Sequence, residues 1–249
     1  MLLEITTMAP DDYVGFTFFI GYMAMAAAAV FFFVERSSVD AKWKMSLLVS
    51  GLITGIAAVH YFYMRDYYLD TGDNPTFFRY VDWTLTVPLM CVEFYLLTKA
   101  AGATKSLLWK LILASTWMLV CGYIGESFNP AIKSGIPADG TTHSVMWGVL
   151  STLGYLYILH AVWLGEVAKL ADKSNSDVVK RGVKTLAWFV LVGWAIYPIG
   201  YMCMDGGWLN IYLEWESKNV DLWYNLADVI NKIGFGLVVY YIAITESKK

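Results

Sequence analysis

Seven long apolar stretches decide what this chain can fold into. A helix needs roughly 17 to 25 mainly apolar residues to cross a hydrocarbon core of about 30 Å. The stretches lie near residues 14–34, 45–65, 75–98, 106–124, 145–165, 185–204 and 222–244. Because they use most of the chain, we predict an all-α membrane protein in a lipid bilayer, with one seven-helix domain over residues 1–249.

Composition excludes several other classes of protein. Hydrophobic residues make up 58% of the chain and charged residues only 16%, which a soluble domain could not bury. The net charge of −3 gives no basic surface for nucleic acid. The three cysteines, Cys91, Cys121 and Cys203, have no metal-ligand spacing, and no nucleophile is placed beside a base. We therefore expect neither a metal site nor an enzyme.

Lysine and arginine are distributed unevenly between the two sides of the predicted bundle. One side carries Arg36, Lys42, Lys44, Lys99, Lys105, Lys110, Lys169, Lys173, Lys180, Arg181, Lys184, Lys248 and Lys249. The other side carries Arg65, Lys133 and Lys218. Loops rich in lysine and arginine stay on the cytoplasmic side of a membrane, so we predict that the N-terminus lies outside and the C-terminus in the cytoplasm. We expect the protein in the inner (plasma) membrane. Acidic residues on the outer side, including Asp221, are interpreted as solvated loop charges.

Ionisable residues inside the apolar stretches form a layer. At 1.5 Å per residue, Lys232 lies near the midplane, while Asp228, Asp82 and His60 lie roughly 7 Å further outward. Glu93 follows Asp82 by eleven residues, which returns it to nearly the same helix face on the cytoplasmic side. One face of the third stretch thus carries a carboxyl group on either side of Lys232.

Such residues are costly in a membrane and usually have a function. Asp228 and Lys232 could form only a structural ion pair at i, i+4, but this does not account for Asp82. Arg79, one turn outward of Asp82, would join both carboxylates in one network. A lysine in an apolar site is also the residue that forms a Schiff base with an aldehyde, and the protonated base needs an anionic counterion.

Three segments carry a resemblance to a known family. The segments "RYVDWTLTVPLMCVEFY", "GWAIYPIGY" and "YNLADVINK" resemble the microbial rhodopsins, especially the proteorhodopsin and xanthorhodopsin branch of light-driven outward proton pumps. The resemblance runs through all seven stretches and includes "FFFVERSSVDAKWK". It implies all-trans retinal bound covalently to Lys232 as a Schiff base. It also suggests a homo-oligomer, a pentamer or a hexamer.

The resemblance assigns roles to the residues of the layer. Asp82 would be the counterion and proton acceptor, Asp228 the second counterion, and Glu93 the cytoplasmic proton donor. Thr86 completes the Asp, Thr, Glu triplet of proton pumps, which differs from the triplets of sodium and chloride pumps. His60 would be the acceptor's partner, or alternatively a histidine bonded to the backbone. The remaining assignments are Arg79 as outer gate and a retinal pocket of Trp83, Met90, Ser151, Trp194, Tyr197, Pro198 and Tyr224.

Four points stay open at this level. The pocket aromatics could be ordinary core, although Tyr224 is expected to hydrogen-bond in the counterion layer. By the resemblance, Met90 occupies the family's spectral tuning position, where an apolar residue rather than glutamine implies green absorption. Gly148 aligns with a glycine that admits a carotenoid antenna in xanthorhodopsin-like pumps, but glycine also serves close helix packing. Glu126 is either a carboxyl group on the proton-release side or a surface charge. A sensory photoreceptor that signals to a membrane transducer is the main alternative function, ahead of a ligand-driven secondary transporter.

Overall fold

The computed structural model describes residues 8–127, 140–203, 209 and 217–248, and within these ranges its regular structure is helical. Seven helical spans are long and apolar enough to cross a membrane, and each corresponds to one predicted stretch. They are Tyr13–Ser38, Lys44–Thr71, Thr76–Ala101, Lys105–Ser127, Thr142–Lys173, Asp177–Cys203 and Val220–Ser247. The predicted seven-helix membrane fold is confirmed.

Several crossings consist of more than one helical element. The first four are α1 (Tyr13–Glu35), α2 (Lys44–Thr71), α3 (Thr76–Thr98) and α4 (Lys105–Ser127), with 3₁₀ turns at Arg36–Ser38 and Lys99–Ala101. The fifth joins α6 (Gly140–Trp163) to α7 (Glu166–Lys173). The sixth joins α8 (Asp177–Trp188), the π-helical segment Phe189–Gly193 and α9 (Ile196–Cys203). The seventh is α11 (Ser217–Ser247).

Polar caps help to define where the helices begin and end. The Asp12 side chain accepts the Gly15 N–H at 2.8 Å, and Ser176 accepts the Val179 N–H at 3.2 Å. Gly72 ends α2 at a φ of +72°, a conformation that favours glycine. Some helices also extend beyond the apolar stretches that predicted them. For the seventh crossing, the helix reaches Ser217 although the apolar stretch begins near residue 222.

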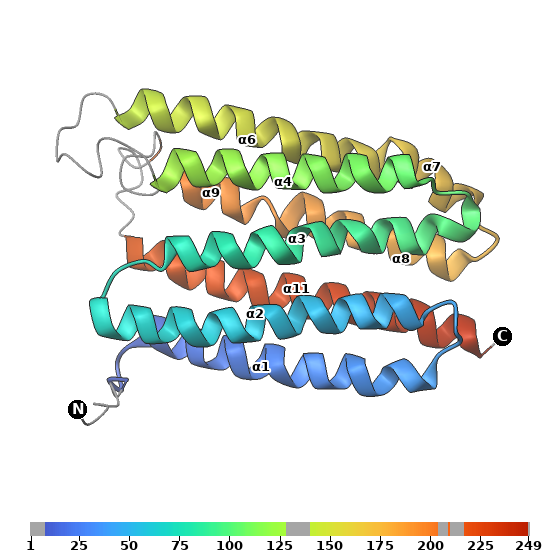
Figure 1. Ribbon diagram of the computed structural model, residues 1–249, viewed down its shortest axis with the longest axis horizontal. Helices are drawn as coiled ribbons and strands as arrows, with labels where there is room; N and C mark the ends of the chain where they lie inside the picture. The colour runs from blue at the N-terminus through green and yellow to red at the C-terminus, as the bar shows by residue number, and fades with distance from the viewer. Residues whose placement is uncertain (1–7, 128–139, 204–208, 210–216, 249) are drawn as a thin grey trace.

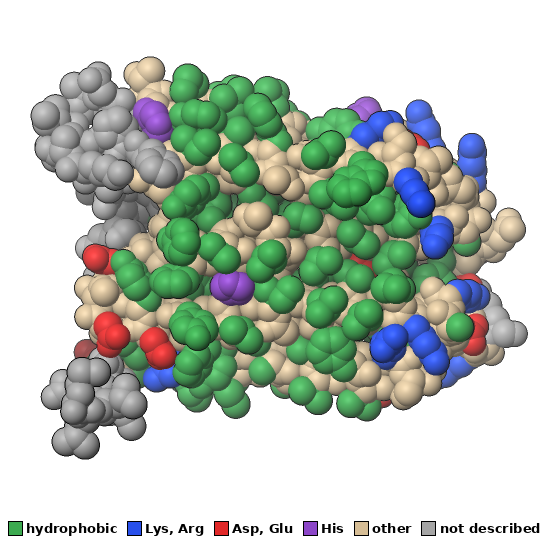
Figure 2. Space-filling view, viewed as in Figure 1, with side chains coloured by type: hydrophobic (Ala, Val, Ile, Leu, Met, Phe, Trp, Pro, Cys, Tyr) green, Lys and Arg blue, Asp and Glu red, His purple; other side chains and the backbone are tan. Residues whose placement is uncertain are grey.

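The long helices lie side by side along one axis, with the two chain ends at opposite ends of the bundle (Figure 1). α1 packs against α2 and α11, and α4 packs against α6. Basic side chains gather at the end that holds the C-terminus, while apolar side chains occupy the middle of the visible face (Figure 2). This arrangement agrees with the charge bias of the sequence. Which end faces the cytoplasm stays a prediction.

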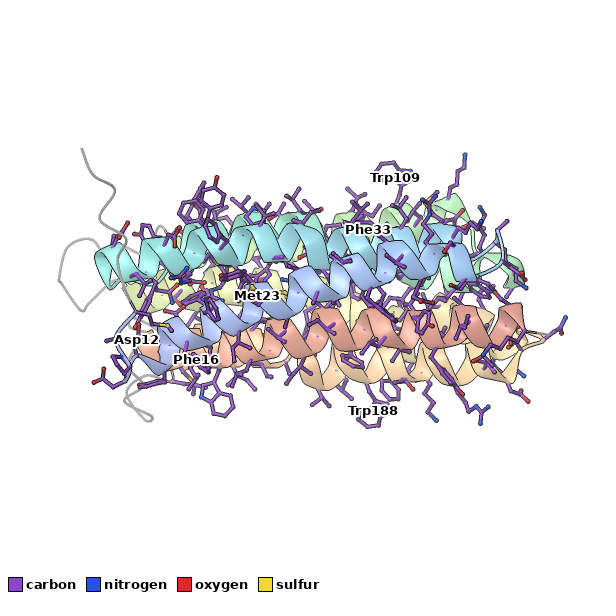
Figure 3. All side chains as sticks on the ribbon, turned by 90° about the horizontal axis from the view of Figure 1, so that it is seen from below. Asp12, Phe16, Met23, Phe33, Trp109 and Trp188 are labelled. Carbon is purple, nitrogen blue, oxygen red and sulfur yellow. The ribbon has the colours of Figure 1, made fainter. Side chains whose placement is uncertain are left out.

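The outside of the bundle is apolar, as lipid contact requires. Trp109 on α4 is 59% exposed and Trp188 on α8 is 50% exposed, and both project away from the ribbon (Figure 3). Phe16 and Met23 of α1 are also about half exposed. In water such a surface would be strongly unfavourable, whereas in a bilayer it faces hydrocarbon. The chain is thus a multi-pass membrane protein whose polar side chains are concentrated inside the bundle and at its ends.

The sixth crossing is interrupted near the centre of the bundle. In its π-helical segment the Trp194 N–H donates to Phe189 O at 2.9 Å, one residue further back than in an α-helix. The Gly193 carbonyl accepts a bond from Asn231 Nδ2 at 3.0 Å. Asn231 directly precedes Lys232, so this bond ties the interrupted crossing to the helix that carries the central lysine.

Candidate functional site: a buried lysine between two carboxylates

Two facing helices each present a row of polar side chains to the interior of the bundle. On α11 the row is Asp221, Asn225, Asp228 and Lys232, whose spacings of four, three and four residues keep them on one helix face. On α3 the row is Arg79, Asp82 and Glu93. All seven side chains are at most 2% exposed. Charged groups so deep in a membrane protein must be paired or hydrogen-bonded.

Lys232 bridges the two rows. Its Nζ contacts Asp82 Oδ2 across the bundle and lies 2.9 Å from Asp228 Oδ2 on its own helix. Sequence-based depth counting placed Asp82 and Asp228 at one level and Lys232 roughly 7 Å further inward, and the structure brings all three into direct contact. One ammonium group therefore neutralises parts of two carboxylates, and the three residues carry a net negative charge when all are ionised.

The two carboxylates have very different surroundings. Asp228 accepts hydrogen bonds from the Tyr197 hydroxyl at 2.6 Å, the Tyr61 hydroxyl at 2.8 Å and the Trp83 indole N–H at 3.1 Å. Asp82 Oδ1 is buried without a hydrogen-bond partner, and its other oxygen contacts only Lys232 among the described side chains. Three donors besides the lysine stabilise the ionised form of Asp228, whereas the negative charge of Asp82 depends mainly on Lys232.

His60 approaches the same group from α2. Its Nδ1 lies 3.8 Å from Asp82 Oδ1, and the ring is 18% exposed. The same nitrogen lies 2.9 Å from the backbone carbonyl oxygen of Ile56, which is within hydrogen-bond distance. Both sequence-based interpretations of His60 are therefore represented: it is bonded to the backbone and it lies beside Asp82.

Arg79 does not join the Asp82 and Asp228 network as the sequence suggested. Its Nη2 lies 2.6 Å from Asp221 Oδ1, and its Nη1 donates to Asn225 Oδ1 at 3.1 Å. Asp221 was interpreted as a solvated loop charge, but it is 1% exposed. This expectation was wrong because α11 begins at Ser217, so Asp221 lies inside the helix and faces the bundle rather than water.

Glu93 lies apart from this cluster, on the side nearer the C-terminal end of the bundle. The Ser50 hydroxyl of α2 donates to Glu93 Oε1 at 3.2 Å, while Oε2 is buried with no partner. No basic side chain within the described residues forms an ion pair with Glu93. Thr86, between Asp82 and Glu93 on α3, bonds its own helix by donating to Asp82 O at 3.0 Å.

A cavity of about 160 Å³ lies between α3, α4, α6, α9 and α11, and Lys232 is among the residues that line it. Every residue predicted for the cofactor pocket lines it: Trp83, Met90, Gly148, Ser151, Trp194, Tyr197, Pro198, Tyr224 and Lys232. The sequence did not identify Tyr80, Tyr155 or Tyr201, which also line it. A mainly apolar cavity that is lined by a buried amine suits an apolar aldehyde.

The tyrosines of the layer are arranged differently from the expectation. Tyr224 was expected to bond in the counterion layer, but its hydroxyl donates to the Tyr197 backbone carbonyl at 2.9 Å. The tyrosine donors to Asp228 are instead Tyr61 and Tyr197. Tyr61 directly follows His60, so its depth was a usable signal. Its rotation toward α11 was not readable from one sequence.

Glu126 is a buried carboxyl group near the C-terminal end of α4. It is 8% exposed, its Oε1 accepts the Thr76 hydroxyl at 3.2 Å, and its Oε2 has no partner. The alternative of a freely solvated surface charge is thus excluded for this residue. Among the described residues, no group of three His, Cys, Asp or Glu side chains could hold a metal ion.

Comparison with known proteins shows which family the chain belongs to. The family model for bacteriorhodopsin-like proteins matches residues 12–246. A green-light absorbing proteorhodopsin from Gamma-proteobacterium EBAC31A08 is 44% identical over 242 residues, which cover 95% of this chain and 89% of the relative. The crystal structure of a blue light-absorbing proteorhodopsin from Med12 is 40% identical, with a TM-score of 0.76 and coverage of 94% and 100%.

A further solved structure is that of xanthorhodopsin, described as a light-driven ion pump with dual chromophore. It is 30% identical, with a TM-score of 0.77 and coverage of 94% of this chain and 93% of that chain. The family match covers nearly all of the chain, the fold agrees along its length, and the identity to proteorhodopsin is well above what fold alone would give. The chain therefore belongs to the bacteriorhodopsin-like family, the microbial rhodopsins.

Proposed function

We propose that this protein is a light-driven outward proton pump, a transporter and not an enzyme. The observation that carries the proposal is the Lys232 amine, which is held between Asp82 and Asp228 and lines an apolar cavity. Glu93 supplies a third carboxyl group, which lies on α3 like Asp82 but eleven residues further along that helix, beyond the level of the amine. A proton pump needs such an acceptor and such a donor on opposite sides of one site.

The cofactor follows from the family and from the cavity. Rhodopsins of this family bind retinal, and the pocket between Trp83, Trp194 and Tyr197 offers aromatic walls next to Lys232. Bound to Lys232 through a protonated Schiff base, retinal would supply light absorption and a change of geometry at the lysine nitrogen. The described side chains then determine where the proton can go.

Asp82 is the better proton acceptor of the two carboxylates. Its Oδ1 has no hydrogen-bond partner and can take a proton without breaking an existing bond. Protonation of Asp228 would oppose three hydrogen bonds from Tyr61, Tyr197 and Trp83. Asp228 therefore remains the fixed negative charge that keeps the site polarised, while the proton resides for a time on Asp82.

Glu93 is placed to return a proton from the opposite side. Because it is buried without an ion-pair partner, its neutral acid form is favoured over a buried isolated charge. Outward transport then follows from the positive-inside prediction, since the basic end of the bundle is the end nearer Glu93 (Figure 2).

Light-driven acidification of a cell suspension tests this function. Cells that express the protein and receive retinal should acidify the medium on illumination, and an uncoupler should abolish the signal. A sensory photoreceptor would form the pigment but leave the medium unchanged. A protein without a retinal site would remain colourless, which would reject both functions.

Replacement of Glu93 by Gln should slow steady-state pumping by about 100-fold, because one proton-transfer group contributes on the order of 10² to 10⁴ in rate. Flash photolysis should show a pigment that forms normally and recovers slowly. Addition of azide, a small diffusible weak acid, should restore part of the rate. Ser115→Ala, a buried change on α4 whose hydroxyl donates to Ile112 O at 2.8 Å, should recover like the wild type. An unchanged recovery in Glu93→Gln would remove Glu93 from the donor role.

A carotenoid antenna is a second, finer part of the proposal, supported by Gly148. This glycine lines the cavity wall on α6, and an added Cβ would lie 2.9 Å from Tyr201 Cε1. A bulky side chain there would collide with the tyrosine ring. The xanthorhodopsin neighbour is described as having a dual chromophore, and an antenna ring could pack against such a glycine.

Gly148→Trp should abolish energy transfer from an added hydroxylated or keto carotenoid. When carotenoid is added to the wild type, the action spectrum of pumping should gain the absorption bands of the carotenoid. Leu153→Trp, which introduces the same side chain at a 56% exposed position on the same helix, should keep them. A wild-type spectrum that carotenoid leaves unchanged would reject the antenna and leave the proton pump unaffected.

A further inference from the structure

Asp221 is a buried carboxylate that the proposed proton path does not use. It lies seven residues before Asp228 on the same face of α11, two turns nearer the outer end. Its partner is Arg79, whose guanidinium lies between the rings of Phe18 and Tyr224 at 5.5 and 5.4 Å. Asn225 accepts a second bond from the same guanidinium. The arginine is thus held by an anion, an amide oxygen and two aromatic faces.

The contacts that Asp221 and Asn225 make with Arg79 form a clamp, which affects the balance of charge in the outer half of the bundle. The two facing rows hold two cations, Arg79 and Lys232, and three carboxylates, Asp82, Asp228 and Asp221, in that half. Arg79 is only three residues from Asp82 on α3, and its long side chain could turn toward Asp82 and Asp228. Neither of these carboxylates lies within ion-pair distance of Arg79, because Asp221 and Asn225 hold the guanidinium outward.

We infer that Asp221 and Asn225 are positioning residues that hold Arg79 away from Asp82 and so determine how readily Asp82 accepts a proton. With the guanidinium clamped, Lys232 is the cation in contact with Asp82. Without the clamp, Arg79 would approach the excess negative charge of Asp82 and Asp228 and stabilise the ionised form of Asp82. This inference rests on the proposed proton pump and adds two residues to its machinery.

Other groups face the same space and must stay constant in a test. From α2 these are His60 and Tyr61, from α9 Tyr197, and from α11 Asp228, Lys232 and Tyr224. Glu126 of α4 and Tyr80 of α3 are further titratable groups in this half of the bundle. None of them is altered in the variants below. A change in titration can then be attributed to the clamp.

The experiment is a pH titration of the visible absorption of the retinal-reconstituted protein, in which the colour change reports protonation of Asp82. In Asp221→Asn the midpoint should fall by about one pH unit or more, since charges a few ångströms apart in a protein interact by at least that much. Asp221→Glu should return most of the shift. Asn225→Ala, which changes no charge, should shift the midpoint in the same direction by a smaller amount.

Thr17→Val serves as the matched control. It removes the bond that Asn225 Nδ2 donates to Thr17 Oγ1 at 3.0 Å but leaves both partners of Arg79 in place, so its midpoint should equal that of the wild type. An unshifted Asp221→Asn would overturn the inference. A shift in Asp221→Asn with none in Asn225→Ala would also overturn it, because Asp221 would then act as a distant charge.

Failure of the proposed function would look different. In that case the wild type would form no pigment, or its colour would not depend on pH. Thermal unfolding of the retinal-free protein would then decide whether the clamp exists. Loss of one partner of a buried ion pair should lower the unfolding midpoint of Asp221→Asn by several degrees, with little change in Thr17→Val. Equal midpoints in the two variants would reject the clamp itself.

Discussion

Replacement of Lys232 by Ala should leave the protein unable to form a pigment with retinal. No visible absorption band should appear, and borohydride reduction under illumination should leave no retinyl group on the protein. The reason is chemical: the Lys232 amine opens into the apolar cavity and is the only amine that lines it in the described part of the chain. The expected effect is complete loss rather than a weaker signal.

Two further variants keep this test decisive. Removal of Lys232 leaves Asp82 and Asp228 buried without their cation, which can cost about 3 to 5 kcal/mol and could prevent folding. Lys232→Ala combined with Asp82→Asn removes one uncompensated charge and should fold, yet still form no pigment. Lys42→Ala, a change of an exposed lysine, should give normal colour. A stable retinyl adduct in the double variant would show that another amine carries the cofactor.

Replacement of Asp82 by Asn should abolish pumping, by at least about 100-fold, while the pigment still forms. The absorption maximum should move to longer wavelength, because loss of an anion beside the cationic nitrogen destabilises the ground state more than the excited state. Wild-type protein at acidic pH should acquire the same band, since a protonated Asp82 has no negative charge. The band of Asp82→Asn should not respond to that acidification.

Asp66→Asn is the appropriate comparison for this variant. Its carboxylate lies near the C-terminal end of α2, and its side chain is 49% exposed. Colour, titration and pumping should all remain as in the wild type. Normal pumping by Asp82→Asn would assign the acceptor role to another group, and the well-bonded Asp228 would be the next residue to test.

The central contacts could be predicted because helix geometry in a membrane is regular. A rise of 1.5 Å per residue was sufficient to place Asp82, Asp228 and His60 at one level, roughly 7 Å outward of Lys232. The structure then brings Lys232 into contact with both aspartates. The residues of the apolar pocket could also be predicted, because the resemblance assigned them to the retinal pocket, and they line the cavity in the structure.

The partner of Arg79 could not be predicted from the sequence. Depth counting gives the level of a Cα atom, but the guanidinium lies several bonds away and can turn outward or inward. The answer depended on where α11 begins, because only a helix that already includes Asp221 presents this residue to the bundle interior. Hydropathy marks the apolar part of a helix and not its polar extension.

The π-helical segment Phe189–Gly193 was also not predicted. The segment "FVLVG" contains no proline, and its single glycine is its last residue. What accompanies the irregularity is a contact from another helix, the bond from Asn231 to the Gly193 carbonyl. An added Cβ at Gly193 would collide with the Asn231 side chain, so this close approach requires glycine. Tertiary contacts of this kind leave no periodic pattern in a sequence.

Light-minus-dark infrared difference spectroscopy of the carboxylic acid C=O stretch tests the central claim most directly, because it observes the proton on the acceptor itself. The account predicts a band from a newly protonated carboxyl group after illumination, present in the wild type and absent in Asp82→Asn. A later loss of acid signal should be absent in Glu93→Gln. A light-induced carboxylic acid band that persists unchanged in Asp82→Asn would contradict the assignment of Asp82 as the proton acceptor.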